Sequence, residues 1–124
     1  MTGIARMRTV VIDCPEPADL AEFYRRLVGG EVTSVSDDWV VLQPDSGGRL
    51  AFQRADDFAP PTWPTGDRPQ QFHLDVTIDD IDEAEPAVLA IGARKHDVQP
   101  GVDDGDTFRV YLDPAGHPFC LCWD

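Results

Sequence analysis

The sequence has 124 residues, the size of one ordinary domain, of which 42% are hydrophobic and 27% charged. This composition is typical of a globular protein and is too apolar for a disordered acidic chain. The 23 acidic residues outnumber the ten basic ones and give a formal charge of −13. Because such a field repels phosphate backbones and anionic membrane surfaces, we expect neither a nucleic-acid partner nor a membrane partner.

The cysteines and the start of the sequence predict a cytoplasmic protein. Cys14, Cys120 and Cys122 have neither the even number nor the spacing of a disulfide framework. No long apolar run followed by a cleavage site opens the sequence, and no stretch approaches the roughly 18 apolar residues of a spanning helix. A reducing compartment fits this pattern best.

The first half of the sequence predicts a strand, a helix and three further strands. Residues 6–14 are rich in β-branched side chains, and two prolines, Pro15 and Pro17, end this extended run. Apolar residues then recur every three or four positions over 18–28, which is typical of an amphipathic helix, and two glycines follow. Three short extended runs, separated by turn-forming residues, come next at 31–35, 38–42 and 49–54.

The second half repeats this order. Residues 70–78 predict a strand, and Asp79 and Asp80 cap a helix that Gly92 ends. Pro86 lies deep in that helix, so we expect a kink or a late start. The last extended runs are predicted near 94–98, 106–112 and 118–123.

Two equivalent halves are the simplest interpretation of this repeat. The letters VVLQPDSGGRLAFQ (40–53) also run parallel to VYLDPAGHPFC (110–120). We therefore predict a single domain over 1–124, with one half over about 6–54 and the other over about 70–123. The proline-rich segment 55–69 between them is predicted to be a linker that wraps on one body.

Strand alternation separates an apolar face from a polar face, because alternate residues of a strand point to opposite sides. The apolar set faces the helices in this prediction, and it contains Val10, Ile12, Leu50, Phe52, Leu74, Val76, Phe119, Leu121 and Trp123. The other set mixes small, polar and ionisable side chains, namely Thr9, Val11, Asp13, Ala51, Gln53, His73, Asp75, Thr77, Cys120 and Cys122. A sheet with such a second face is expected to curve around a pocket.

Three stretches resemble the vicinal oxygen chelate superfamily, which includes glyoxalase I, bleomycin resistance proteins and extradiol dioxygenases. They are residues 12–30, 71–84 and 111–123, and the last contains the Asp-Pro-x-Gly turn that precedes the final strand. The resemblance implies an α+β fold of two βαβββ modules that form a cupped, barrel-like, eight-stranded mixed sheet with helices on its outer face. It also implies a glyoxalase-like domain protein.

Metal-dependent members of the superfamily take four ligands from the first and last strands of each half. Carried over by position, these ligands fall on Thr9, Gln53, His73 and Cys120. Only Gln53 and His73 match residue types that the superfamily uses. We therefore predict an incomplete metal site and expect no cofactor, with a divalent ion such as Zn, Ni, Mn or Fe as the alternative.

His73, Gln53 and Asp75 are the candidate catalytic residues. The imidazole of His73 can move a proton or bind a metal, and its alternative is a hydrogen-bonded histidine that lines the sheet. Asp75, two residues away on the same face, can orient His73 or act as a base, or else it is an ordinary surface carboxylate. Gln53 can both donate and accept a hydrogen bond to a ligand.

The candidate ligand-binding residues are Thr9, Trp39, Trp63, Arg109, Tyr111 and Cys120. Cys120 can offer a thiolate, although a small packing group is its alternative role. Trp39, Arg109 and Tyr111 form a pocket wall only if their face is the cupped one; on the outer face Arg109 is a solvated charge. Trp63 either closes over the pocket or anchors the linker.

These observations predict a glyoxalase-like small-molecule-binding protein. It acts either as a metal-independent lyase or isomerase or as a sequestering protein, and it is expected to be a homodimer, as many members of the superfamily are. The alternative is a divalent-metal-dependent lyase or dioxygenase of the same superfamily. A fold kept only for partner interaction is a third interpretation, which fold resemblance by itself does not exclude.

Overall fold

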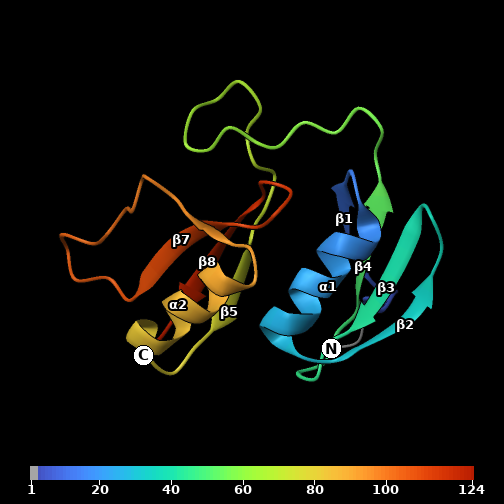
Figure 1. Cartoon of the computed structure of the whole chain (residues 1–124), viewed down its shortest axis with the longest axis horizontal. Coiled ribbons are helices and arrows are strands. Elements are labelled where there is room, and N and C mark those ends of the chain that lie inside the picture. Colours follow the sequence, from blue (N-terminus) through green and yellow to red (C-terminus); the bar gives the residue numbers. More distant parts are fainter. Residues whose placement is uncertain (1–2) are drawn as a thin grey trace. The chain divides into compact units, whose positions relative to one another are not determined.

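The computed structural model describes residues 3–124, and the chain divides after Phe58 into two compact units. Each unit contains the strand-helix-strand-strand-strand order that the sequence predicts, so the expected α+β fold of two βαβββ modules is confirmed (Figure 1). The strands form two four-stranded mixed sheets, one in each module. Each module is described by itself below.

The N-terminal module contains β1 (Val10–Cys14), α1 (Pro17–Val28), β2 (Glu31–Val35), β3 (Trp39–Gln43) and β4 (Leu50–Arg54). Its strand order is β1-β4-β3-β2, with β1 parallel to β4 and the other pairs antiparallel. Tyr24 of α1 stacks on Phe52 of β4 with ring centroids 5.5 Å apart, and both side chains are buried. The helix therefore covers the face of the sheet to which Phe52 belongs.

The C-terminal module contains β5 (Leu74–Thr77), α2 (Ile81–Ala90), β6 (Arg94–Lys95), β7 (Phe108–Leu112) and β8 (Pro118–Cys122). Its order, β5-β8-β7-β6, repeats that of the first module, with β5 parallel to β8. Asp80 caps α2 by accepting a hydrogen bond from the backbone N–H of Asp82 at 2.9 Å. The helix begins directly after this cap, and Pro86 lies in its interior, so the expected late start does not occur.

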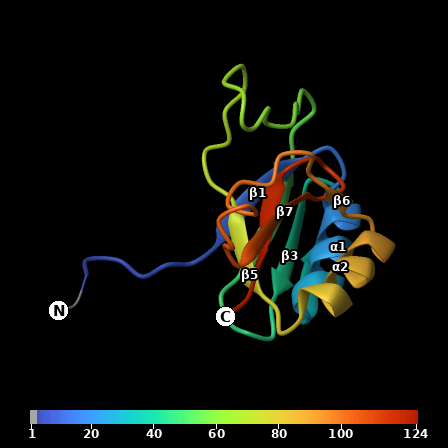
Figure 2. The ribbon, with the colours of Figure 1, turned by 90° about the vertical axis from the view of Figure 1, so that its left-hand side faces the viewer.

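Helix α2 lies on one face of its sheet, as Figure 2 shows for the C-terminal module. The hydroxyl of the buried Tyr111, on β7, donates a hydrogen bond to Glu85 of α2 at 2.7 Å. Tyr111 is register-paired with Phe119 of β8, so these two residues share the helix-covered face. The opposite face of this sheet is the one that carries Asp75 and Cys120, which are also register-paired.

The segment expected to be a linker is attached to the C-terminal module. Gly116 has a φ of 98°, and an added Cβ there would lie 2.7 Å from Cβ of Pro60, so only glycine fits this close approach. His96 contacts Trp63 twice, through a hydrogen bond from Nε2 to the Trp63 carbonyl at 3.1 Å and an edge-on ring contact at 5.0 Å. These contacts fix the position of the segment 59–69 on this module.

No helix formed by residues 3–124 has the length and apolar character needed to cross a membrane.

Candidate functional site

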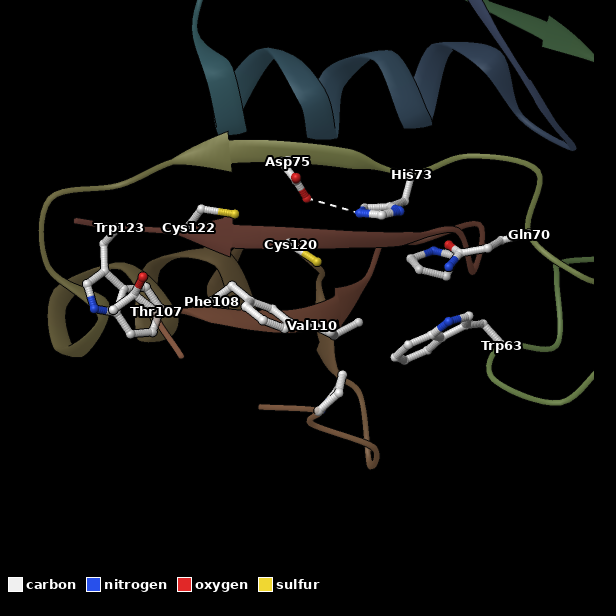
Figure 3. Close-up of a pocket in the computed structure, with 12 residues that line it drawn as sticks. Trp63, Gln70, His73, Asp75, Thr107, Phe108, Val110, Cys120, Cys122 and Trp123 are labelled. Carbon is white, nitrogen blue, oxygen red and sulfur yellow. Dashed lines mark ion pairs between the residues drawn. The ribbon is translucent and has the colours of Figure 1, made fainter. Parts of the chain in front are cut away.

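A pocket of about 440 Å³ opens on the polar face of the sheet in the C-terminal module. All of its walls come from this module, and most of them are apolar or aromatic (Figure 3). The lining residues are Trp63, Gln70, His73, Asp75, Pro100, Thr107, Phe108, Val110, Pro118, Cys120, Cys122 and Trp123.

Strand register explains why side chains distant in sequence meet in this pocket. Asp75 of β5 lies opposite Cys120 of β8, and Val110 of β7 lies opposite Cys120 on the other side. One step along the same face, Phe108 is paired with Cys122. Because side chains of directly opposed residues point to the same face, these five form one continuous surface.

His73 and Asp75 form the polar end of the pocket. His73 Nε2 lies 3.1 Å from Asp75 Oδ1, and their side chains point toward each other (Figure 3). The His73 side chain is 39% exposed and that of Asp75 62%, so both are accessible to a ligand from solvent. A carboxylate that accepts a hydrogen bond from Nε2 orients the imidazole and leaves Nδ1 to contact a ligand.

The two pocket cysteines are held as neutral thiols. Burial raises the pKa of the Cys120 thiol to about 12. Electrostatic repulsion from Asp75 and from Cys122 raises this pKa too, and so does a hydrogen bond with Asp75. Burial, followed by the charge of Asp75, also raises the pKa of Cys122. Since the thiolate is the nucleophile, neither cysteine is activated for attack at neutral pH.

Among residues 3–124, His73, Asp75 and Cys120 form a group that could hold a metal ion. Their nitrogen, oxygen and sulfur donors all lie within 4.8 Å of one another. Zinc bonds of about 2.0–2.3 Å in a tetrahedron place neighbouring donors about 3.5 Å apart, so the group must contract and Cys120 must lose its proton to bind an ion. The donor types fit a divalent metal, with Asp75 in a place that the sequence did not assign to a ligand.

Arg109 and Tyr111 lie on the other face of the sheet, where they are paired with Leu121 and Phe119. The Arg109 guanidinium lies 5.1 Å from the ring centroid of Trp123 and donates a hydrogen bond to the carbonyl of Phe108 at 2.7 Å. Neither Arg109 nor Tyr111 lines the pocket. The wall that β7 contributes consists of its alternate residues, Phe108 and Val110.

Thr9, Gln53 and Trp39 belong to the N-terminal module. Thr9 directly precedes β1, and Gln53 is paired with Asp13 on one side and Trp39 on the other. Gln53 and Trp39 therefore share one face of their own sheet. The proposed metal positions are thus divided between the modules, with His73 and Cys120 in the second one.

Gln70, Phe108, Val110 and Trp123 were not predicted as site residues. Gln70 precedes β5 in irregular backbone, so strand alternation says nothing about it. Trp123 was assigned to the apolar face, but it lies beyond the end of β8 and lines the pocket. Phe108 and Val110 follow from the alternation of β7 once its register with β8 is known.

The family model described as a glyoxalase-like domain matches residues 9–122. This match covers nearly the whole sequence, and the fold is that of the vicinal oxygen chelate superfamily. The chain therefore belongs to the glyoxalase-like domain family of this superfamily. A search of curated proteins found no match.

Several solved structures share the fold. A glyoxalase/bleomycin resistance protein/dioxygenase family enzyme from Burkholderia phytofirmans PsJN is 16% identical, with a TM-score of 0.71 over 96% of this chain and 98% of that one. A glyoxalase family protein from Enterococcus faecalis is 21% identical, with a TM-score of 0.70 and the same coverage. A glyoxalase-related enzyme from Fulvimarina pelagi is 17% identical, with a TM-score of 0.66 over 98% and 89%. At these identities the similarity shows the fold alone.

Proposed function

We propose that this protein binds an organic small molecule in the pocket of its C-terminal module and needs no metal ion to do so. The supporting observation is a cavity of about 440 Å³ with largely apolar walls and a His73–Asp75 pair at one end. A mainly apolar concavity with a few convergent polar groups is typical of small-molecule sites. Membership of the glyoxalase-like family agrees with this function.

The same pair supports a lyase or isomerase step that consists of proton transfer. With its Nε2 hydrogen donated to Asp75, His73 takes a proton from a ligand carbon at Nδ1 and returns it to a different atom. The imidazolium formed between the two transfers is stabilised by the Asp75 carboxylate at 3.1 Å. If the protein only sequesters its ligand, the pocket is needed but this transfer is not. The role predicted for Gln53, in the other module, stays a prediction.

A screen of small organic molecules by thermal shift, on protein dialysed against a chelator, tests this proposal. Thr107 is an exposed lining residue, so Thr107→Trp fills the pocket without changing the core. Molecules that stabilise the unaltered protein should fail to stabilise this variant. His73→Gln should still bind them but lose any turnover. A screen without hits, or hits that ignore Thr107→Trp, would contradict the proposal.

A divalent-metal-dependent lyase or dioxygenase is the second candidate, favoured by the cluster of His73, Asp75 and Cys120. A metal bound there would supply a positive charge that polarises oxygen atoms of the ligand. In that case His73 and Asp75 serve as ligands and are not free to move a proton. The two candidates therefore assign different tasks to the same side chains.

Cobalt binding separates the two candidates. If the cluster is a metal site, one equivalent of Co²⁺ should survive dialysis and show thiolate-to-cobalt charge-transfer absorption, which Cys120→Ser should abolish. Cys14→Ser is the matched control, because Cys14 is a fully buried thiol outside the pocket lining. Retention of well under one equivalent leaves the metal-independent function as the supported one.

A further inference from the structure

Three aromatic side chains, Trp63, Phe108 and Trp123, supply much of the pocket wall. In Figure 3 Phe108 and Trp63 lie on the side of the pocket opposite His73 and Asp75. The faces of aromatic rings attract cations, and the tryptophan face does so most strongly. Trp123 already shows this behaviour, because the guanidinium of Arg109 lies 5.1 Å from its ring centroid.

The charged and polar lining favours the same kind of ligand. Asp75 is a carboxylate, whereas none of the twelve residues that line the pocket in the described part of the chain is Lys or Arg. Among the lining residues an anionic ligand would therefore meet a carboxylate and no Lys or Arg; the guanidinium of Arg109, on the other face of the sheet, reaches only the ring of Trp123 at 5.1 Å. The formal charge of −13 on the whole chain acts in the same direction by drawing cations toward the protein.

The side chain of Gln70 contains a hydrogen-bond acceptor that no protein donor satisfies in the described part of the chain. Its Oε1 atom is buried and has no hydrogen-bond partner among residues 3–124. Buried carbonyl oxygens in proteins are nearly always hydrogen-bonded, so an unsatisfied one that lines a pocket points to a ligand donor. Gln70 lies next to His73 at one end of the pocket, and Trp63 faces the two of them across that end (Figure 3).

We infer that the natural ligand is a flat aromatic molecule that carries a protonated amine. The ring packs among Trp63, Phe108 and the apolar wall, while the ammonium group is placed at the end formed by Asp75 and Gln70. Its N–H groups donate to the Asp75 carboxylate and to Gln70 Oε1, and its charge is attracted to the aromatic faces. This inference rests on the proposed function, because it assigns a ligand class to the same pocket.

Matched probes that differ only in charge test the inference by calorimetry. Tryptamine, tryptophol and indoleacetate place a cation, a neutral alcohol and an anion on one ring, and phenethylamine, phenylethanol and phenylacetate repeat the series on a smaller ring. In each series the amine should bind about tenfold more tightly than the alcohol. The anion should bind most weakly, and added salt should weaken binding of the amine.

Variants show whether the preference arises in this pocket. Asp75→Asn and Gln70→Leu should each reduce the difference between amine and alcohol. Asp57→Asn removes the same charge from an exposed residue outside the lining and should leave the preference unchanged. If alcohol or anion binds as tightly as the amine, the inference is overturned while the pocket stands. If no member of either series binds, the inference is overturned as well, and the thermal-shift screen with Thr107→Trp then decides separately whether the pocket binds another organic molecule.

Discussion

At the scale of single residues, strand alternation was enough to predict part of the site. It placed His73, Asp75 and Cys120 on one face, and all three line the pocket, where the register of β5 with β8 pairs Asp75 with Cys120. It did not decide on which face Arg109 lies. The internal sequence repeat aligns Arg109 with Trp39, and the face of Trp39 was equally open. In the structure Trp39 is paired with Gln53 on the polar face, whereas Arg109 is paired with Leu121 on the apolar face. The alignment of the two halves by sequence is therefore shifted by one residue from their alignment by strand face.

Residues outside the strands could not be predicted in this way. Gln70 and Trp63 reach the pocket from irregular backbone, and their positions depend on contacts such as that between Trp63 and His96. No period in the sequence encodes such contacts. The lack of a hydrogen-bond partner for Gln70 Oε1 likewise depends on the residues around it in three dimensions, and no sequence pattern near Gln70 indicates it.

Tyr111→Phe should destabilise the protein by about 1.5–3 kcal/mol at neutral pH, because it removes a hydrogen bond to the charged Glu85. That hydrogen bond, followed by the one from Lys95, lowers the pKa of Glu85. A lowered folded-state pKa contributes stability above the unfolded pKa, and this stability is lost as pH falls through the folded value. The stability difference between the two proteins in urea should therefore shrink as pH falls below about 4.

Glu85→Gln provides the control for this prediction. The amide oxygen of glutamine still accepts a hydrogen bond from Tyr111 but does not titrate. The Glu85→Gln variant should keep part of the stability that the hydrogen bond contributes. That contribution should no longer decrease as pH falls, because the glutamine has no proton to gain. A pH-independent cost of Tyr111→Phe would show that the hydrogen bond does not couple to the charge of Glu85.

Cys120 should react with iodoacetamide at pH 7.5 more than about a hundredfold more slowly than an exposed thiol, since its pKa is raised to about 12. Asp75→Asn removes one charge and one hydrogen bond that raise this pKa, so it should speed the reaction. Fragment mass spectrometry distinguishes Cys120 from Cys122. Urea-unfolded protein, in which all thiols are accessible, is the control, and rapid labelling of native Cys120 would contradict the prediction.

At the scale of elements, periodicity predicted both helices and the order of all the strands. Burial of one face leaves a clear pattern, as in α1, where Leu20, Phe23 and Tyr24 are buried. The pattern was weakest where little is buried. The run predicted near 94–98 forms only the two-residue strand β6 (Arg94–Lys95), and both of its residues are exposed. Pro86 lies inside a helix that the rule for proline would have shortened.

Gly116→Ala tests how firmly the segment 59–69 is attached to the turn before β8. The added Cβ would lie 2.7 Å from Pro60, and the residue must also keep a φ of 98°. We expect a loss of about 2–4 kcal/mol in the free energy of unfolding, measured in urea. Because Pro60 and Trp63 belong to the same segment, ligand binding should weaken as well.

Gly105→Ala is the matched control for this variant. Gly105 also has a positive φ, 79°, but nothing lies within 4 Å of an added Cβ. It should therefore show the cost of the backbone conformation without the contact with Pro60. Equal losses for the two variants would mean that the contact with Pro60 contributes nothing.

At the scale of the whole molecule, the βαβββ repeat and the resemblance to the superfamily predicted the fold, because the same strand order recurs in both modules. The single domain over 1–124 stays a prediction. Charge and size say little about assembly, since a field of −13 opposes self-association without forbidding it. Assembly therefore has to be argued from the surfaces that each module leaves exposed.

A homodimer remains our prediction, and the structure supplies a physical reason for it. Strands β1 and β2 are the edge strands of one sheet, and β5 and β6 are those of the other; an edge strand carries backbone N–H and C=O groups that its own sheet does not pair. Val35, in the end strand β2, is 67% exposed, and Phe72, just before β5, is 60% exposed. Association of two copies through such edges would bury both backbone groups and apolar side chains.

Light scattering over a salt series tests this prediction. Two subunits that each carry a charge of −13 repel one another, and screening shortens the range of this repulsion to about 10 Å at 0.1 M salt. The dimer fraction should therefore rise with salt, as expected for an interface held by apolar contacts. Val35→Lys and Phe72→Lys would each place a charge at one candidate edge, and the edge that forms the interface is the one whose variant stays monomeric. A monomer mass for the unaltered protein at high micromolar concentration and moderate salt would show that the chain acts alone.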